Sequence, residues 1–98
     1  MSEELPASLS TLVWQLAATA LHYLGRPIAE GNSKLEVNLP LARHTIDTLE
    51  MLKQKTEGNR SLEETELLND LLYQLRIAYL QALNESHEQS GKKRKEKN

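Results

Sequence analysis

Apolar residues recur three and four positions apart in the first part of the chain, and this spacing predicts a helix from Ser8 to Leu24. No charged residue occurs between Leu5 and Gly25, although hydroxyl, amide and imidazole side chains interrupt the run. The stretch is therefore too polar for a membrane span, and burial by neighbouring protein is favoured over a membrane-surface helix.

A second stretch with helical periodicity follows a connection that is rich in turn-forming residues, from Gly25 to Asn38. Asn38 is an N-cap residue type, and Pro40 suits a first helical turn because the N–H that it lacks would be unpaired there. Gly58 tolerates the left-handed conformation that ends many helices. These signals predict a helix over residues 39–56.

The third periodic stretch begins at Ser61 and Glu64, which together match a reciprocal capping box. Its apolar stripe predicts a helix from Leu62 to around Ser86, about 37 Å long at 1.5 Å per residue, whereas the first two helices should each span roughly 25 Å. The second and third helices therefore form a hairpin. The expected fold is an all-α, three-helix domain.

The longest helix presents more apolar surface than two shorter helices can cover. A homo-oligomer, with a dimer favoured, is the simplest way to bury the excess, because isologous dimers are the commonest soluble assemblies. The residues assigned to this self-association surface are Leu67, Ile77, Leu80, Leu83 and Trp14.

The 98 residues support one domain, predicted over residues 8–86, with a flexible N-terminus (1–7) and a disordered tail (87–98). The chain has no cysteine, which excludes disulfides and thiol chemistry. Its first residues are acidic, unlike a secretory signal. A cytoplasmic location and no membrane span are expected.

The net charge of −2 conceals an asymmetry along the chain. The tail has a balance of +3, which leaves −5 on the rest, so the folded part is not expected to bind phosphates broadly. A solvated tail is favoured over a weak, salt-dependent contact with nucleic acid or an anionic membrane. The basic residues of the tail are Lys92, Lys93, Arg94, Lys95 and Lys97.

Candidates for chemistry are few. His44 and Asp47 lie three apart on a helix and could share a metal ion, but such a lone pair more often makes structural hydrogen bonds. Neither a phosphate-binding loop nor a nucleophile motif is present, so no cofactor, metal or enzymatic activity is expected. A possible polar recognition patch, for which a structural hydrogen-bonding role is favoured, comprises Arg43, His44, Asp47, Asn69, Tyr73 and Arg76.

The run from Leu41 to Leu52, with the segments 55–59, 62–66 and 71–76, closely resembles a small bacterial family catalogued as domain of unknown function 1844. The segment 16–25 also resembles the opening of that family. The resemblance covers roughly residues 8–79 and leaves the basic tail outside. It implies a bacterial, cytoplasmic, helical protein and supplies no activity, cofactor or functional residue.

We therefore expect a non-enzymatic helical module that self-associates and contacts an unknown protein partner. The alternative is an adaptor that touches nucleic acid or a ribonucleoprotein through the basic tail. A metal-dependent enzyme centred on His44 and Asp47 is the least favoured function.

Overall fold

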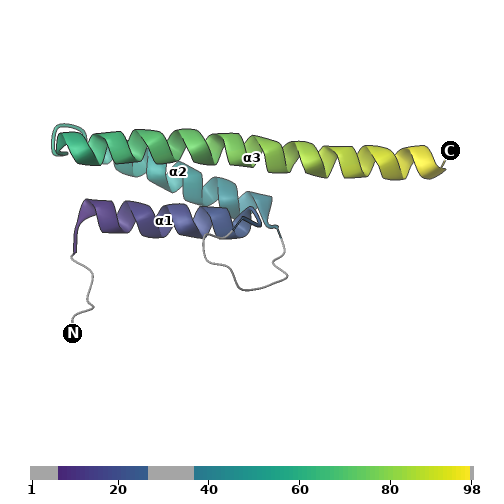
Figure 1. Ribbon diagram of the computed structural model, residues 1–98, viewed down its shortest axis with the longest axis horizontal. Coiled ribbons are helices and arrows are strands. Elements are labelled where there is room, and N and C mark those ends of the chain that lie inside the picture. Colours follow the sequence, from purple (N-terminus) through teal and green to yellow (C-terminus); the bar gives the residue numbers. More distant parts are fainter. Residues whose placement is uncertain (1–6, 27–36, 98) are drawn as a thin grey trace.

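Three helices make up the fold of the residues that the structure describes. The computed structural model describes residues 7–26 and 37–97, with side chains described as far as His87. In chain order the helices are α1 (Leu9–Tyr23), α2 (Leu39–Lys55) and α3 (Leu62–Lys97) (Figure 1). The described residues contain no strand. The all-α, three-helix class predicted from the sequence is confirmed.

Each end of α1 is closed by a local signal. The Ser8 hydroxyl accepts a hydrogen bond from the backbone N–H of Thr11 at 3.1 Å, which satisfies one of the free donors of the first turn. Gly25 adopts a φ of 76°, and the N–H of Arg26 bonds the carbonyl of Leu21 at 2.8 Å. This pairing is a Schellman ending, in which a left-handed glycine reverses the chain.

The predicted signals around α2 and α3 act as expected. Asn38 Oδ1 accepts from the N–H of Leu41 at 3.0 Å, and Gly58 has a φ of 83° in the turn after α2. The N–H of Ser61 donates to the Glu64 carboxylate at 2.8 Å, while the N–H of Glu64 donates to the Ser61 hydroxyl at 3.1 Å. The capping box is therefore complete, and the helical hairpin is confirmed.

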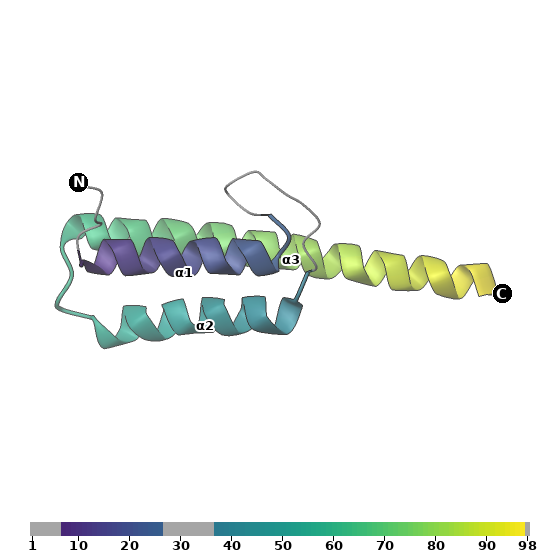
Figure 2. The ribbon, with the colours of Figure 1, turned by 90° about the horizontal axis from the view of Figure 1, so that it is seen from below.

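The helices alternate in direction: α1 and α3 run the same way, and α2 runs back beside both of them (Figures 1 and 2). Their facing sides form the core. Leucines of α3 belong to the larger cluster of buried residues, whereas near the close of α1 a smaller cluster joins Leu24 to Ala42 of α2 and to Ala78 and Ala82 of α3. The buried apolar residues are Val13, Ala17, Ala20, Leu24, Ala42, Ile46, Leu49, Leu68, Leu71, Leu72, Leu75, Ala78 and Ala82.

Helix α3 is about twice as long as either partner, with 36 residues against 15 and 17, and it extends well past them (Figure 1). It also ends later than the predicted end near Ser86. The prediction relied on the lack of apolar residues after Leu83, but Lys, Arg, Glu and Gln are themselves good helix formers, so the backbone can remain helical without an apolar face. The predicted disorder of the tail in solution stays a prediction.

Two other predicted segments fall largely outside the described residues. The N-terminal segment is described only from Ala7, and the connection between α1 and α2 is described only at its two ends. At those ends, the N–H of Asn38 donates to the carbonyl of Tyr23 at 2.8 Å, and Val37 Cγ2 lies 3.0 Å from where a β-carbon on Gly25 would sit. The close of α1 is thus tied directly to the start of α2.

Candidate interaction surface

The outer face of α3 carries three neighbouring apolar side chains, Tyr73, Ile77 and Leu80. Their spacing of four and three residues places them on one side of the helix, opposite the buried leucines. Tyr73 is 65% exposed, Ile77 38% and Leu80 61%. We call these three residues the α3 apolar patch. It lies near the middle of the 36-residue helix.

The predicted self-association residues do not form one surface. Leu67 is partly buried and packs against the core, because it flanks the buried side of α3 beside Leu68 and Leu71. Leu83 is also partly buried. Trp14 is 49% exposed but belongs to α1. Of the five predicted residues, Ile77 and Leu80 therefore lie side by side on one exposed face.

Tyr73 completes the patch, although the sequence analysis assigned it to the polar set. Its hydroxyl is a polar tip on a large apolar ring, and such amphipathic aromatic side chains are enriched at protein interfaces. The spacing of residues 73, 77 and 80 was the signal that could have found it, because these positions share one helix face.

The predicted polar patch is divided between two helices. Arg43 and Asp47 form an ion pair on the open surface of α2, with Nε and Oδ2 3.9 Å apart and both side chains well exposed. Arg76 of α3 pairs with Glu50 of α2, which was not among the residues of the predicted polar patch. Exposed ion pairs of this kind contribute little to stability, typically below about 1 kcal/mol.

His44 and Asn69 are exposed on their respective helices. The backbone carbonyl of His44 accepts a hydrogen bond from the Thr48 hydroxyl at 2.8 Å, an ordinary helix contact. Within residues 7–26 and 37–87, no three potential ligand side chains from His, Asp and Glu gather closely enough to hold a metal ion.

Sequence reasoning missed Arg60, which organises the turn between α2 and α3. Its side chain is only 8% exposed. One guanidinium nitrogen donates to the carbonyl of Lys53 at 2.6 Å and to the Thr56 hydroxyl at 3.1 Å, while Nε donates to the Thr65 hydroxyl at 3.1 Å. The other terminal nitrogen lies 3.7 Å from the Glu57 carboxylate. Arg60 therefore joins the end of α2 to the start of α3.

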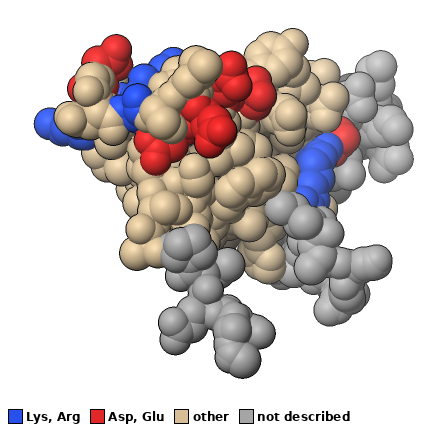
Figure 3. All heavy atoms as spheres, turned by 60° about the vertical axis from the view of Figure 1, so that its left-hand side comes forward, with Lys and Arg blue, Asp and Glu red and all other residues tan. Residues whose placement is uncertain are grey.

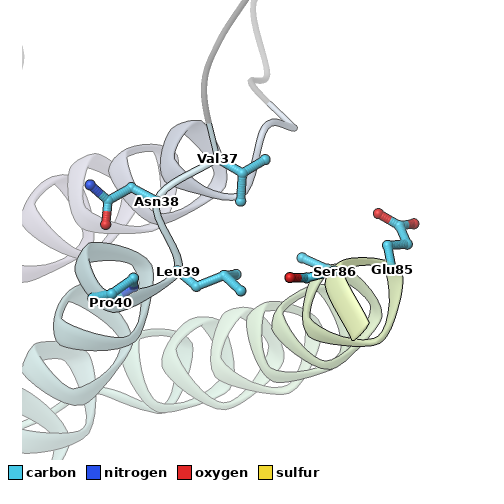
Figure 4. Close-up of a pocket in the computed structure, with 7 residues that line it drawn as sticks. Val37, Asn38, Leu39, Pro40, Glu85 and Ser86 are labelled. Atoms are coloured by element: carbon cyan, nitrogen blue, oxygen red, sulfur yellow. The ribbon is translucent and has the colours of Figure 1, made fainter. Parts of the chain in front are cut away.

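A groove of about 440 Å³ lies where α3 leaves the bundle (Figure 4). The start of α2 forms one wall and α3 forms the other. The Glu85 carboxylate lies 3.2 Å from the Arg26 guanidinium, so the one charged group of the lining already has a partner. The lining residues are Val37, Asn38, Leu39, Pro40, Ala82, Glu85 and Ser86. This open, mixed groove offers contact area and no cluster of reactive groups.

Acidic side chains gather at the hairpin end of the molecule. Figure 3 shows Asp and Glu side chains, with Lys and Arg side chains among them, over the upper part of this end, whereas the lower part is made of uncharged side chains. Acids in the first turn of a helix are stabilised by its dipole. Glu63 and Glu64 occupy that turn of α3, and Glu66 and Asp70 follow as exposed residues.

Comparisons with known proteins identify the family alone. None of the helices among the described residues is long and apolar enough to cross a lipid bilayer. Searches of curated proteins and of solved structures returned no match to the chain. A family profile described as "Domain of unknown function (DUF1844)" matches residues 6–81, which include α1, α2 and the first half of α3. The chain therefore belongs to the DUF1844 family.

Proposed function

We propose that this domain is a non-enzymatic protein–protein interaction module that self-associates as a homodimer through the outer face of α3. The observation that carries the proposal is the α3 apolar patch. Its three side chains are exposed on a helix whose opposite side already fills the core, so they have no further role in the fold of the single chain.

The energetic motive is the burial of this patch. Full burial of a leucine-sized side chain contributes roughly 1.5–3 kcal/mol, and the patch contains two such aliphatic residues beside a tyrosine ring. A specific interface usually covers about 800 Å² on each partner, which is more than three side chains supply. The contact should therefore continue along α3 on both sides of the patch.

The placement of the polar side chains supports an interaction role over a catalytic one. Arg43 pairs with Asp47 on open surface, and Arg76 pairs with Glu50 across two helices. These groups therefore neutralise one another beside the bundle instead of converging in a cavity. The pair of His44 and Asp47 remains the least favoured candidate for metal-dependent chemistry.

Sedimentation equilibrium of the full chain tests the proposal. At micromolar concentration we expect the wild-type protein to have twice the monomer mass, and Leu80→Glu to be monomeric because it puts a charge at the centre of the interface. Met51→Glu is the matched control, since Met51 is an exposed apolar residue on α2. Circular dichroism confirms that each variant is folded.

Two results would overturn the proposal. One is a wild-type protein that stays monomeric up to about 100 µM. Its Kd would then exceed about 100 µM, which corresponds to a binding free energy of less than roughly 5.5 kcal/mol. The other is a Met51→Glu variant that dissociates the dimer as fully as Leu80→Glu does, because the α3 apolar patch would then have no special role.

A second candidate function is favoured by the continuation of α3 to Lys97, through the segment with five basic residues. In this alternative, the extension contacts nucleic acid while the bundle contacts a protein. Binding of a fluorescein-labelled RNA or duplex DNA should then weaken steeply with salt, and deletion of residues 87–98 should flatten that dependence. Binding that is unchanged by the deletion would dismiss this role of the tail.

A further inference from the structure

The charges of α3 are segregated along its length. Its first third has exposed acids at Glu63, Glu66 and Asp70, the α3 apolar patch lies in the middle, and the sequence of the last segment has five basic residues against one acid after residue 91. All of this lies on one continuous helix from Leu62 to Lys97. The helix therefore has an acidic start, an apolar centre and a basic end.

We infer that the second copy of the chain lies antiparallel along the outer face of α3, so that the acidic start of one α3 faces the basic end of the other. This inference rests on the proposed self-association and adds its orientation and register. The partner that fits this face is therefore a second α3 running in the opposite direction, because the charges of the two helices are then complementary.

The backbone register supports this arrangement. A twofold axis between Ala78 and Tyr79 places Ile77 level with Leu80 of the second copy. The same axis brings Glu63 level with position 94, inside the basic segment of the second helix, whereas Asp70 comes level with His87, before that segment begins. Because the axis lies close to the midpoint of α3, the two helices overlap along nearly their whole length.

The outer face has the spacing that a helix pair requires. Exposed positions follow one another at intervals of three and four residues along it, so a partner helix can track this face without crossing to another side. The positions are Leu62, Glu66, Asn69, Tyr73, Ile77, Leu80, Asn84 and His87. Helices α1 and α2 pack against the opposite side of α3 and leave the face open.

A parallel pair would place like charges together. Glu63, Glu66 and Asp70 of one chain would face the same acids of the other, and the two basic ends would also meet. Like charges at matched positions destabilise a helix pair, whereas the antiparallel pair turns both repulsions into attractions.

Spin labelling measures the orientation directly. The chain has no cysteine, so Asn69→Cys, on the outer face, provides a single labelling site without other changes. In the antiparallel dimer, the two labelled positions should lie about 30 Å apart, from nineteen residues of helical rise and the spacing of two packed helices. A parallel dimer would place them at about 10 Å.

Charge reversal tests the complementarity independently. The variant Glu63→Lys, Glu66→Lys should weaken dimerisation about tenfold, and so should Lys92→Glu, Arg94→Glu. Combining all four substitutions should restore the wild-type Kd within about threefold, because the opposite signs then face each other again. Arg43→Glu, on exposed α2 surface, is the control and should leave the Kd unchanged.

The outcomes separate the inference from the proposed function. Two results overturn the antiparallel arrangement and leave self-association standing. One is a dimer with a short distance between the two labelled positions 69. The other is a variant with all four substitutions whose Kd does not return toward the wild-type value. A monomeric wild-type protein overturns both. A separation of about 30 Å together with recovery of the Kd supports both.

Discussion

At the scale of single residues, the guanidinium of Arg60 joins the end of α2 to the start of α3. It satisfies the carbonyl of Lys53 in the last turn of α2 and a hydroxyl in the first turn of α3. A positive charge at the end of a helix also interacts favourably with the helix dipole. Because the side chain is nearly buried, its loss would leave these partners poorly solvated.

We therefore expect Arg60→Ala to lower the free energy of unfolding by about 1–3 kcal/mol, measured by urea denaturation. Arg60→Lys should recover less than half of this loss, because a single ammonium cannot reproduce the fork of Nε and Nη donors. Arg43→Ala is the comparison for an exposed arginine and should stay within about 0.5 kcal/mol of the wild type. A change of that small size for Arg60→Ala would contradict a structural role for the cluster.

At the scale of elements, α1 is packed through small side chains. Ala17 and Ala20 are fully buried, and Ala42 of α2 and Ala78 of α3 are also in the core. Alanine adds little volume between helices, so the axes can come close, and it is also the best helix former. Helix α1 contacts both other helices, but Leu12 and Trp14 are exposed, so this packing explains only part of its uncharged sequence.

This packing predicts that replacement by leucine changes the free energy of unfolding differently at two neighbouring alanines. Ala17→Leu should lower the free energy of unfolding by about 1–3 kcal/mol, because extra methylene groups must displace the facing helices. Ala18→Leu should change it by less than about 0.5 kcal/mol, since Ala18 is only partly buried. Urea denaturation of both variants measures the difference, and equal effects would refute close packing at Ala17.

At the scale of the whole molecule, the length of α3 decides the shape. The molecule measures 56 Å along its longest axis, close to the roughly 54 Å expected for a 36-residue helix. The two shorter helices cover one side of this helix and leave its outer face open. The proposed dimer would use this open face.

Dimer formation should make thermal stability depend on protein concentration. We expect the Tm of the wild-type protein to rise by about 2–4 °C for each tenfold increase in concentration, because unfolding is then coupled to dissociation. The Tm of Leu80→Glu should not change with concentration. Differential scanning calorimetry over two decades of concentration tests this, and a constant wild-type Tm would argue against the dimer.

Trp14 offers an internal check on which helix forms the interface. It is the single tryptophan and is half exposed on α1. If the second copy contacts α3 alone, the emission maximum of Trp14 should stay the same as the protein dimerises. A blue shift with rising concentration would instead place α1 in the interface, as the sequence-based surface suggested.

The sequence determined the three helices and the turn between α2 and α3. The predicted caps at Asn38 and Ser61 and the predicted left-handed Gly58 have the expected geometry, and the helix predicted from Ser8 to Leu24 is found as Leu9–Tyr23 with Ser8 as its N-cap. These features depend on hydrogen bonds between residues a few positions apart, so local sequence is sufficient to specify them. The late end of α3 was missed because helix propensity was given less weight than the absence of apolar residues.

Only the tertiary structure decided which apolar residues stay exposed and which charged side chains form pairs. Leu67 packs against the core whereas Leu80 stays open, and Tyr73 joins Ile77 instead of a polar cluster. Glu50 acquired its role from Arg76 on another helix. Periodicity identifies the side of a helix that a residue occupies, but burial and pairing depend on how the helices are placed against one another in space.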